Sequence, residues 1–340
     1  MKKLAIIPFT VITLLYSCSK TNVTPAKTTT TTTTTPSSYV ADQVTVYSGI
    51  SNYPSNTIVN GPIATAEYAY PQGMALDASG NLYVTDWLGG DIRKITPAGI
   101  VSTYATGLHL PAYLAVDGPG NVYFTQNQAC AEVSTEGHII GLATLNAYQG
   151  ITADNSGNIF VATQTQILKL DKASGSFSFY AGDAASGTID GAAAKAKFSN
   201  IRSLATDKKG NIFAMDGNSI RIINTLTDSV KTLTLKVSGS PFALPQGIAV
   251  DEWDNIYVVN DGNPIGGGPN EGNGYILKIT PDGTVSNFAG NQQLAGDAFL
   301  TGPAQSVAFD APNGIVLLPS GDFLVSTIDN VIKKITTHKQ

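Results

Sequence analysis

Short runs of hydrophobic residues alternate with polar turns along most of the chain, and one such pattern returns about six times. Its unit is an apolar run, a tight turn that most often reads Asp-x-x-Gly-Asn, and a second apolar run. The copies occupy residues 73–84, 113–124, 150–161, 203–214, 247–258 and 314–325. Short apolar runs bounded by turn residues favour β-strands, and a repeat of roughly 40 to 50 residues is typical of propeller blades.

Each unit continues into two more strands. In the first unit, residues 91–95 are expected to form a third strand, a Pro-x-Gly turn follows, and residues 101–104 are expected to form a fourth, so four antiparallel strands make one blade. The sixth unit stops at Gln340 without a fourth strand, whereas residues 43–49 look like a fourth strand with no first three before it. Pairing the two would close a ring and remove two exposed sheet edges. We therefore expect an all-β fold, a six-bladed β-propeller over residues 39–340, closed by an N-terminal strand that pairs with the last blade.

Aspartates recur at the turn between the first and second strands of a blade. An Asp at the start of a turn accepts hydrogen bonds from its own backbone, and a following Gly tolerates positive φ. The series is therefore expected to be structural rather than catalytic; its members are Asp77, Asp117, Asp154, Asp207 and Asp251.

Composition supports many short strands and excludes one class of partner. Only 13% of residues are charged, about half the usual share of roughly 25%, and the chain contains 34 Gly and 17 Pro. The net charge is −5 and the isoelectric point is about 5.1. Without a basic stripe, binding to nucleic acid is not expected.

The N-terminus is interpreted as an export signal followed by a tether. Lys2 and Lys3 precede an apolar stretch that is too short for a permanent transmembrane helix. Its end, Leu15-Tyr16-Ser17-Cys18, resembles the bacterial lipobox. The resemblance implies a signal peptide at 1–17 and a lipid-modified Cys18 that anchors the protein to a membrane. Because no Asp follows Cys18 as an inner-membrane retention signal, the expected location is the outer membrane. The alternative is an ordinary signal with a chance cysteine. Residues 18–38 are polar and Thr-rich, which is typical of a flexible tether.

Several segments of the repeat resemble the NHL repeat family. The resemblance rests on Ile248–Asp251 with Asn255–Val258, on Thr280-Pro-Asp-Gly283 and on Gly187-Thr-Ile-Asp-Gly191 continuing to Phe198. It covers nearly all of the chain from about Val44 onwards. It implies a β-propeller, usually of six blades.

Connections in such a meander alternate between two faces. The short Asp turns share one face, which we call the turn face, and the long segments fall on the other, the loop face; these segments are residues 50–70, 183–200, 261–274 and 291–312. Long loops on a rigid scaffold often bind ligands, but three of these segments can equally be the inter-blade segment of the family.

The first strands should begin at the loop-face mouth of a central channel. Residues at that position are Gln72, Ala112, Gln149, Arg202, Gln246 and Asn313. Amide side chains both donate and accept hydrogen bonds, and Arg202 suits a carboxylate or phosphate. The ends of second strands add Asp86, Trp87 and Asp261 as candidate binding residues. The ligand would be a glycan, a peptide or a protein; the alternative is that the ring only hydrates the channel.

Catalytic interpretations have less support. Six-bladed propellers related to gluconolactonases hold a divalent metal with Glu, Asn and Asp at these strand starts, where this chain has Gln72, Arg202 and Gln246. No metal or other cofactor and no catalytic residue is therefore expected. The sequence indicates a monomeric, non-catalytic cell-envelope binding or scaffolding propeller; the alternative is a hydrolase or lyase of a sugar lactone-like substrate.

Overall fold

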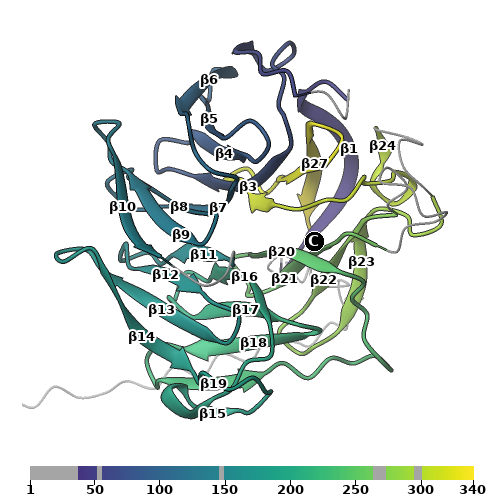
Figure 1. Cartoon of the computed structure of the whole chain (residues 1–340). Helices are drawn as coiled ribbons and strands as arrows, with labels where there is room; N and C mark the ends of the chain where they lie inside the picture. The colour runs from purple at the N-terminus through teal and green to yellow at the C-terminus, as the bar shows by residue number, and fades with distance from the viewer. Residues whose placement is uncertain (1–36, 52–55, 145–148, 263–272, 295–300) are drawn as a thin grey trace, which may run out of the picture. The chain divides into compact units, whose positions relative to one another are not determined.

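The computed structural model describes residues 37–51, 56–144, 149–262, 273–294 and 301–340. These residues form six antiparallel sheets arranged around one axis, as Figure 1 shows. Two short 3-10 turns, η1 (Ala193–Lys195) and η2 (Ala304–Ser306), are the helical elements of the described ranges. The predicted all-β, six-bladed propeller is thus confirmed.

Blades are numbered in chain order, and one strand of each lies nearest the axis. Blade 1 contains β2 (Gly61–Pro62), β3 (Pro71–Leu76), β4 (Leu82–Asp86), β5 (Asp91–Ile95) and β6 (Ile100–Ala105). Blade 2 contains β7 (Pro111–Val116), β8 (Val122–Gln126), β9 (Ala129–Val133) and β10 (Ile139–Thr144). Blade 3 contains β11 (Ile151–Ala153), β12 (Ile159–Ala162), β13 (Gln166–Asp171) and β14 (Ser176–Gly182).

The second half of the ring repeats this order. Blade 4 contains β15 (Gly191–Ala192), β16 (Ile201–Thr206), β17 (Ile212–Asp216), β18 (Ser219–Asn224) and β19 (Ser229–Thr232). Blade 5 contains β20 (Pro245–Val250), β21 (Ile256–Asn260), β22 (Tyr275–Ile279) and β23 (Val285–Ala289). Blade 6 contains β24 (Gly302–Pro303), β25 (Ile315–Leu317), β26 (Phe323–Ser326), β27 (Val331–Lys339) and the N-terminal β1 (Tyr39–Gly49). The innermost strands β3, β7, β11, β16, β20 and β25 contact one another in turn, and β25 contacts β3, so the ring is closed.

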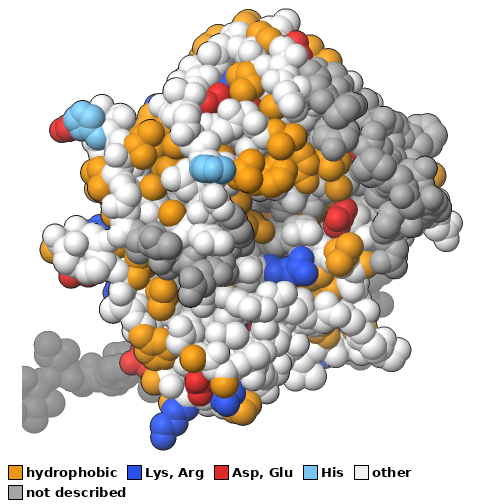
Figure 2. All heavy atoms as spheres, viewed as in Figure 1, with side chains coloured by type: hydrophobic (Ala, Val, Ile, Leu, Met, Phe, Trp, Pro, Cys, Tyr) orange, Lys and Arg blue, Asp and Glu red, His pale blue; other side chains and the backbone are white. Residues whose placement is uncertain are grey.

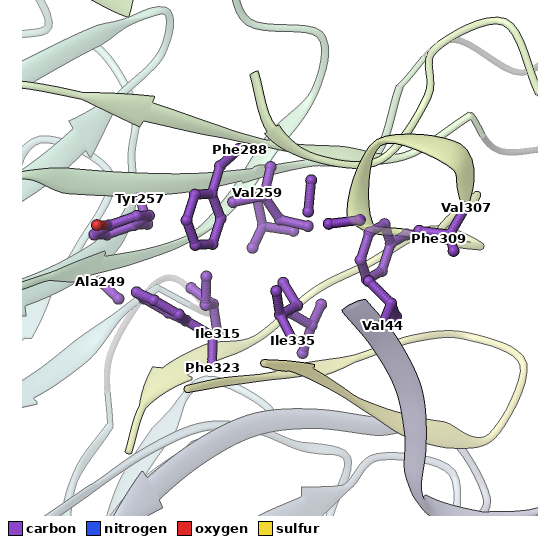
Figure 3. Packing of buried hydrophobic residues seen from close by; sticks show 14 of the residues in the cluster. Val44, Ala249, Tyr257, Val259, Phe288, Val307, Phe309, Ile315, Phe323 and Ile335 are labelled. Carbon is purple, nitrogen blue, oxygen red and sulfur yellow. The ribbon is translucent and has the colours of Figure 1, made fainter. Parts of the chain in front are cut away.

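The closure uses the N-terminal strand, as predicted. β1 pairs antiparallel with β27 along its length, with Val44 opposite Ile335 and Tyr39 opposite Lys339. Figure 3 shows Val44 and Ile335 in one buried cluster with Phe309, Phe323 and aromatic residues of blade 5. The first and last parts of the chain therefore share a hydrophobic core. Burial of this apolar surface stabilises the closed ring.

The recurring aspartates hold their own turns. Asp77 accepts hydrogen bonds from the backbone N–H of Asn81 at 2.8 Å and from its side chain at 2.7 Å. The same pair of bonds recurs in the next four blades, at Asp117, Asp154, Asp207 and Asp251. The prediction that this series is structural is confirmed.

Three long inter-blade segments return along the outer edge of a blade, and we call residues 61–68, 191–198 and 302–309 the straps. In each strap a two-residue strand pairs with the outermost strand, β2 with β6, β15 with β19 and β24 with β1. Each strap begins at a glycine with positive φ: Gly61 (135°), Gly191 (133°) and Gly302 (148°). Of the two interpretations given to these segments, the structure favours the inter-blade one, because much of their length is built into the blades.

A buried cation from the third strand fastens each strap. Arg93 donates to the carbonyl oxygens of Glu67 and Val59, and Arg221 donates to those of Lys197 and Ile189. Lys333 donates to the carbonyl of Ala308 at 3.0 Å. Each cation also lies over an aromatic ring of its strap, at 5.2 Å from Tyr68, 4.8 Å from Phe198 and 5.4 Å from Phe309. Cation–π contacts of desolvated groups add to the attraction of the carbonyl dipoles.

Candidate functional site

The channel is narrowest near the loop face, where the backbones of neighbouring inner strands approach closely. A Cβ atom on Gly73, Gly150, Gly247 or Gly314 would lie only 2.3 to 2.6 Å from a backbone atom of the next blade. Glycine is therefore required there by close backbone approach. The opening at this level has a volume of about 60 Å³. We call it the neck.

Two blades carry a larger residue at the glycine position, Tyr113 in blade 2 and Ser203 in blade 4, and both line the neck. Burial raises the pKa of the Tyr113 hydroxyl, and the positive charge of Arg202 acts on it in the opposite direction. Tyr113 was not among the predicted site residues. Its signal in the sequence is that it replaces a glycine found at four of the six aligned positions.

The predicted ring lies at the loop-face starts of the inner strands. Gln72, Gln149, Arg202, Gln246 and Asn313 are half-buried, whereas Ala112 is buried. Asn313 lines the neck itself, and its side-chain amide donates to the carbonyl of Ala311 at 3.1 Å. The face viewed in Figure 2 is hollowed near its middle, with Lys or Arg side chains beside the hollow.

Three further candidate binding residues were predicted at the ends of second strands. One of them is structural, and the other two remain candidates for ligand binding. Asp86 is fully buried, accepts from the backbone N–H of Ala69 at 2.8 Å and pairs with Arg93 at 3.5 Å, so it fastens a strap and is not accessible to a ligand. Trp87 is half-buried, and its ring centroid lies 5.3 Å from that of Tyr70. Asp261 is half-buried, and burial raises its pKa. Residues 263–272 of the predicted loop next to it lie outside the described residues.

The turn-face end of the channel is wider than the neck. All six inner strands line a cavity of about 420 Å³ there, and we call it the chamber. The side chains that line it are aliphatic apart from Thr152, Asn155 and Thr206, and none is charged. The free edges of the inner strands add backbone N–H and C=O groups, and the accessible wall is more polar than apolar. The amide ring and the chamber thus lie at opposite ends of one channel.

The residues of the channel mouth do not suit a divalent metal ion. Within the described ranges, no group of three or more His, Cys, Asp and Glu could hold a metal ion. At the starts of the inner strands a divalent cation would meet the amides of Gln72 and Gln246 and the positive charge of Arg202, so these residues do not fit such a metal. The described residues also include no helix that is long and apolar enough to cross a membrane. The predicted lipid-modified Cys18 lies outside the described residues.

Comparison with known proteins shows the fold but no family. No family model matches the chain, and no curated protein matches it either. An auxiliary nutrient binding protein from Bacteroides thetaiotaomicron is similar in structure with a TM-score of 0.66 at 16% identity, over 87% of this chain and 76% of that one. A second auxiliary nutrient binding protein, from Bacteroides ovatus, has a TM-score of 0.64 at 16% identity, over 88% and 77% of the two chains. A gluconolactonase from Xanthomonas campestris has a TM-score of 0.56 at 10% identity, over 80% and 87%. At these identities the likeness establishes the propeller architecture and nothing finer.

Proposed function

We propose that this protein is an exported, lipid-anchored NHL-type propeller that binds a glycan or peptide at the loop-face mouth of its channel without catalysing a reaction. The observation that carries the proposal is the polar ring with one cation, Arg202, above a neck that glycine backbones and Tyr113 narrow. A ligand seated there would cover the ring without passing into the channel.

The chemistry of the mouth suits a hydroxyl-rich ligand with a carboxylate. Amide side chains of Gln72, Gln149 and Gln246 offer both donors and acceptors. Arg202 offers a fork of N–H donors to a carboxylate. The rings of Tyr70 and Trp87, which pack together next to β3, provide aromatic surface against which a sugar ring can lie. An acidic oligosaccharide combines these features, and a peptide with a free carboxylate is the second choice.

Two further observations support a binding role in the envelope. The two Bacteroides structures that resemble the chain over most of its length are described as auxiliary nutrient binding proteins. In addition, Ser37, the first described residue, is held on the turn face, since its carbonyl accepts from Asn255 of the Asp251 turn at 2.9 Å. A tether that joins the propeller there leaves the loop face clear of the attachment point.

Isothermal titration of the purified chain against acidic oligosaccharides, their neutral counterparts and carboxyl-terminal peptides tests the mouth. Arg202→Ala should weaken binding of the acidic ligand by about tenfold or more, since a charge-assisted hydrogen bond contributes about 1.5–3 kcal/mol. Gln246→Ala should weaken it less. Lys231→Ala removes an exposed cation from the outermost strand of the same blade and serves as the matched control. Unchanged affinity in both mouth variants would refute the site.

Lipid attachment is tested separately. Labelled palmitate supplied to a lipoprotein-processing bacterial host should enter the expressed protein and be lost in Cys18→Ser. Equal labelling of the two forms would exclude Cys18 as the anchor. A stoichiometric calcium or zinc ion in the purified protein would instead favour the sugar-lactone hydrolase or lyase alternative.

A further inference from the structure

On the basis of the function proposed above, we propose that the neck holds the anionic end of the ligand, where Arg202 and the hydroxyls of Tyr113 and Ser203 bind one carboxylate. The ligand would cover the amide ring with its body and reach the top of the neck with this group alone. Tyr113 and Ser203 thereby become specificity-determining residues of the mouth. All three side chains belong to the described part of the chain.

Arg202 differs from the other two arginines of the chain in having no acidic partner. Arg93 and Arg221 are fully buried, and each pairs with an Asp of the preceding strand. Arg202 is half-buried, and no residue in the described ranges accepts a hydrogen bond from its guanidinium or forms an ion pair with it. Because burial removes part of its hydration, this cation favours an anion that a ligand supplies.

The phenol of Tyr113 is not needed to hold its strand. At the same position of blade 1, the backbone N–H of Gly73 donates to the Thr85 hydroxyl of the second strand at 2.8 Å. Tyr113 makes the corresponding bond with its own backbone N–H, which donates to Thr125 Oγ1 at 3.3 Å. Its side chain is therefore additional, and the phenol oxygen has no hydrogen-bond partner among the described residues. Burial raises the pKa of this hydroxyl, so it stays protonated and can donate to a ligand.

Ser203 adds a second hydroxyl from blade 4. It is 6% exposed and lines the neck, and its side chain has no hydrogen-bond partner in the part of the chain that the structure describes. Blades 2 and 4 both adjoin blade 3, so Tyr113 and Ser203 flank Gly150, which has no side chain to separate them. Arg202 precedes Ser203 in the chain, and its positive charge acts on the Tyr113 hydroxyl. Three unused donors therefore lie on one side of the neck.

The neck contains no acidic side chain that could occupy these donors. Its lining residues include no Asp or Glu. Across the neck, in blade 6, the side-chain amide of Asn313 already donates to the carbonyl of Ala311 at 3.1 Å. Hydrogen bonds to a charged acceptor are stronger than those to a neutral one. A carboxylate therefore matches the three donors better than a hydroxyl or an amide of the ligand would.

The size of the neck selects a group that projects from the body of the ligand. Its volume is about 60 Å³, and about 10–15 Å³ measured in this way holds one water molecule. The neck thus has room for a few water molecules or for one carboxylate in their place, but not for a sugar ring. The exocyclic carboxylate of a uronic acid and the C-terminal carboxylate of a peptide both have the required shape.

Isothermal titration of the full chain with trigalacturonate and with its methyl ester tests the donors. Tyr113→Phe removes only the hydroxyl and should weaken binding of the acid by about tenfold, because a hydrogen bond to a charged group is lost. Ser203→Ala should weaken it by about three- to tenfold for the same reason. The ester should bind less tightly than the acid and should be affected little by either change. A tripeptide with a free C-terminus and its amide form a second pair of probes, which shows whether the carboxylate comes from a sugar or from a peptide.

The matched control is Tyr180→Phe. It removes the hydroxyl of another half-buried tyrosine, in the outermost strand of blade 3, and should leave the affinity for the acid unchanged. The double variant Tyr113→Phe with Arg202→Ala tests whether the two groups bind the same carboxylate. In that case the loss of affinity in the double variant should be smaller than the product of the two single losses.

Acetate alone tests the neck without any oligosaccharide. In protein labelled with ¹³C at the tyrosine ζ carbon, the signal that is missing from Tyr113→Phe should shift saturably as acetate is added. The shift should disappear in Arg202→Ala.

The outcomes separate the neck from the mouth. If Tyr113→Phe and Ser203→Ala bind the acid as the unmodified chain does, the neck site is overturned, whereas weaker binding in Arg202→Ala would still support the mouth. If neither the oligosaccharide nor the peptide binds the unmodified chain, the proposed function fails and acetate decides on the neck. A saturable shift of the Tyr113 signal would then support the anion site, and no shift would refute it.

Discussion

Among the described residues, a strap strand pairs with blades 1, 4 and 6 and with no other blade. The two sets of blades differ at one position of the third strand. Opposite the middle of the second strand, the strapped blades have Arg93, Arg221 and Lys333. At the same register the other blades have Ala131, Leu168 and Leu277. A cation is present only where a returning segment supplies carbonyl oxygens and an aromatic ring.

The same position of the third strand is therefore packed in two ways, by a strap around a cation or by apolar contacts alone. A charge removed from water is costly unless polar groups surround it, so a buried Arg requires a strap and a strapless blade requires an apolar residue. It also bears on function. Since the long segments serve largely to hold the blades together, they offer less free surface for a ligand than the ends of the channel do.

The largest effect is expected where strap and closure coincide, in blade 6. Deleting residues 1–49 removes β1, which pairs with both β27 and the β24 strap. We expect loss of cooperative folding, equivalent to most of a domain's stability of about 5–15 kcal/mol. Thermal unfolding followed by circular dichroism measures this, with deletion of residues 1–36 as the control. A 1–49 deletion that melts like the control would break the closure model.

The next largest loss of stability is expected when a strap loses its buried cation. Arg221→Leu leaves the buried Asp216, which pairs with it at 3.0 Å, without its cation. We expect a loss of about 3–5 kcal/mol in urea unfolding, as for other buried pairs that lose one partner. Arg221→Lys should lose less stability, because Lys333 is the cation that contacts the strap in blade 6. Equal stability of Arg221→Leu and the unmodified chain would show that the buried cation does not stabilise the strap.

Placing a cation in a strapless blade should cost less stability than removing one from a strapped blade. Leu277→Arg puts a cation into a blade that has no strap to receive it. We expect a loss of about 2–3 kcal/mol, since part of the cost can be avoided if the long side chain reaches solvent. Leu277→Met keeps the apolar character and should cost less than about 1.5 kcal/mol. If the two variants unfold at the same urea concentration, the difference between strapped and strapless blades is not one of charge.

The smallest effect concerns pH. Burial raises the pKa of Asp86 from 3.8 to about 6. Because the protonated carboxyl is the form that burial favours, its contribution to stability is complete below about pH 4 and is lost as the pH rises through about 6, with a slope of at most about 1.4 kcal/mol per pH unit.

Asp86→Asn makes this position of blade 1 resemble blade 5, which has Asn260 there, and should remove the slope. Urea unfolding at a series of pH values between 4 and 7 measures it. A slope that persists unchanged in the variant would assign the pH dependence to another group.

The candidate site could be predicted from the sequence only in part. The starts of the repeats gave the positions of Gln72, Arg202 and Gln246, since each lies at a fixed offset from an Asp turn. The burial of Asp86 could not be seen, because its partner Arg93 and the backbone of Ala69 meet it only once the strap has returned. The role of Tyr113 in the neck depends on how closely the neighbouring blades approach.

The sequence by itself determined the strands, the Asp turns, the number of blades and the strand that closes the ring, because each of these depends on local patterning repeated along the chain. Tertiary structure decided which end of the channel is wide, where the straps run and which charges are buried. Those properties depend on distances between blades, such as the 2.3 Å that would separate a Cβ on Gly314 from the carbonyl of Gln72. Residues so far apart in the chain carry no local signal of that contact.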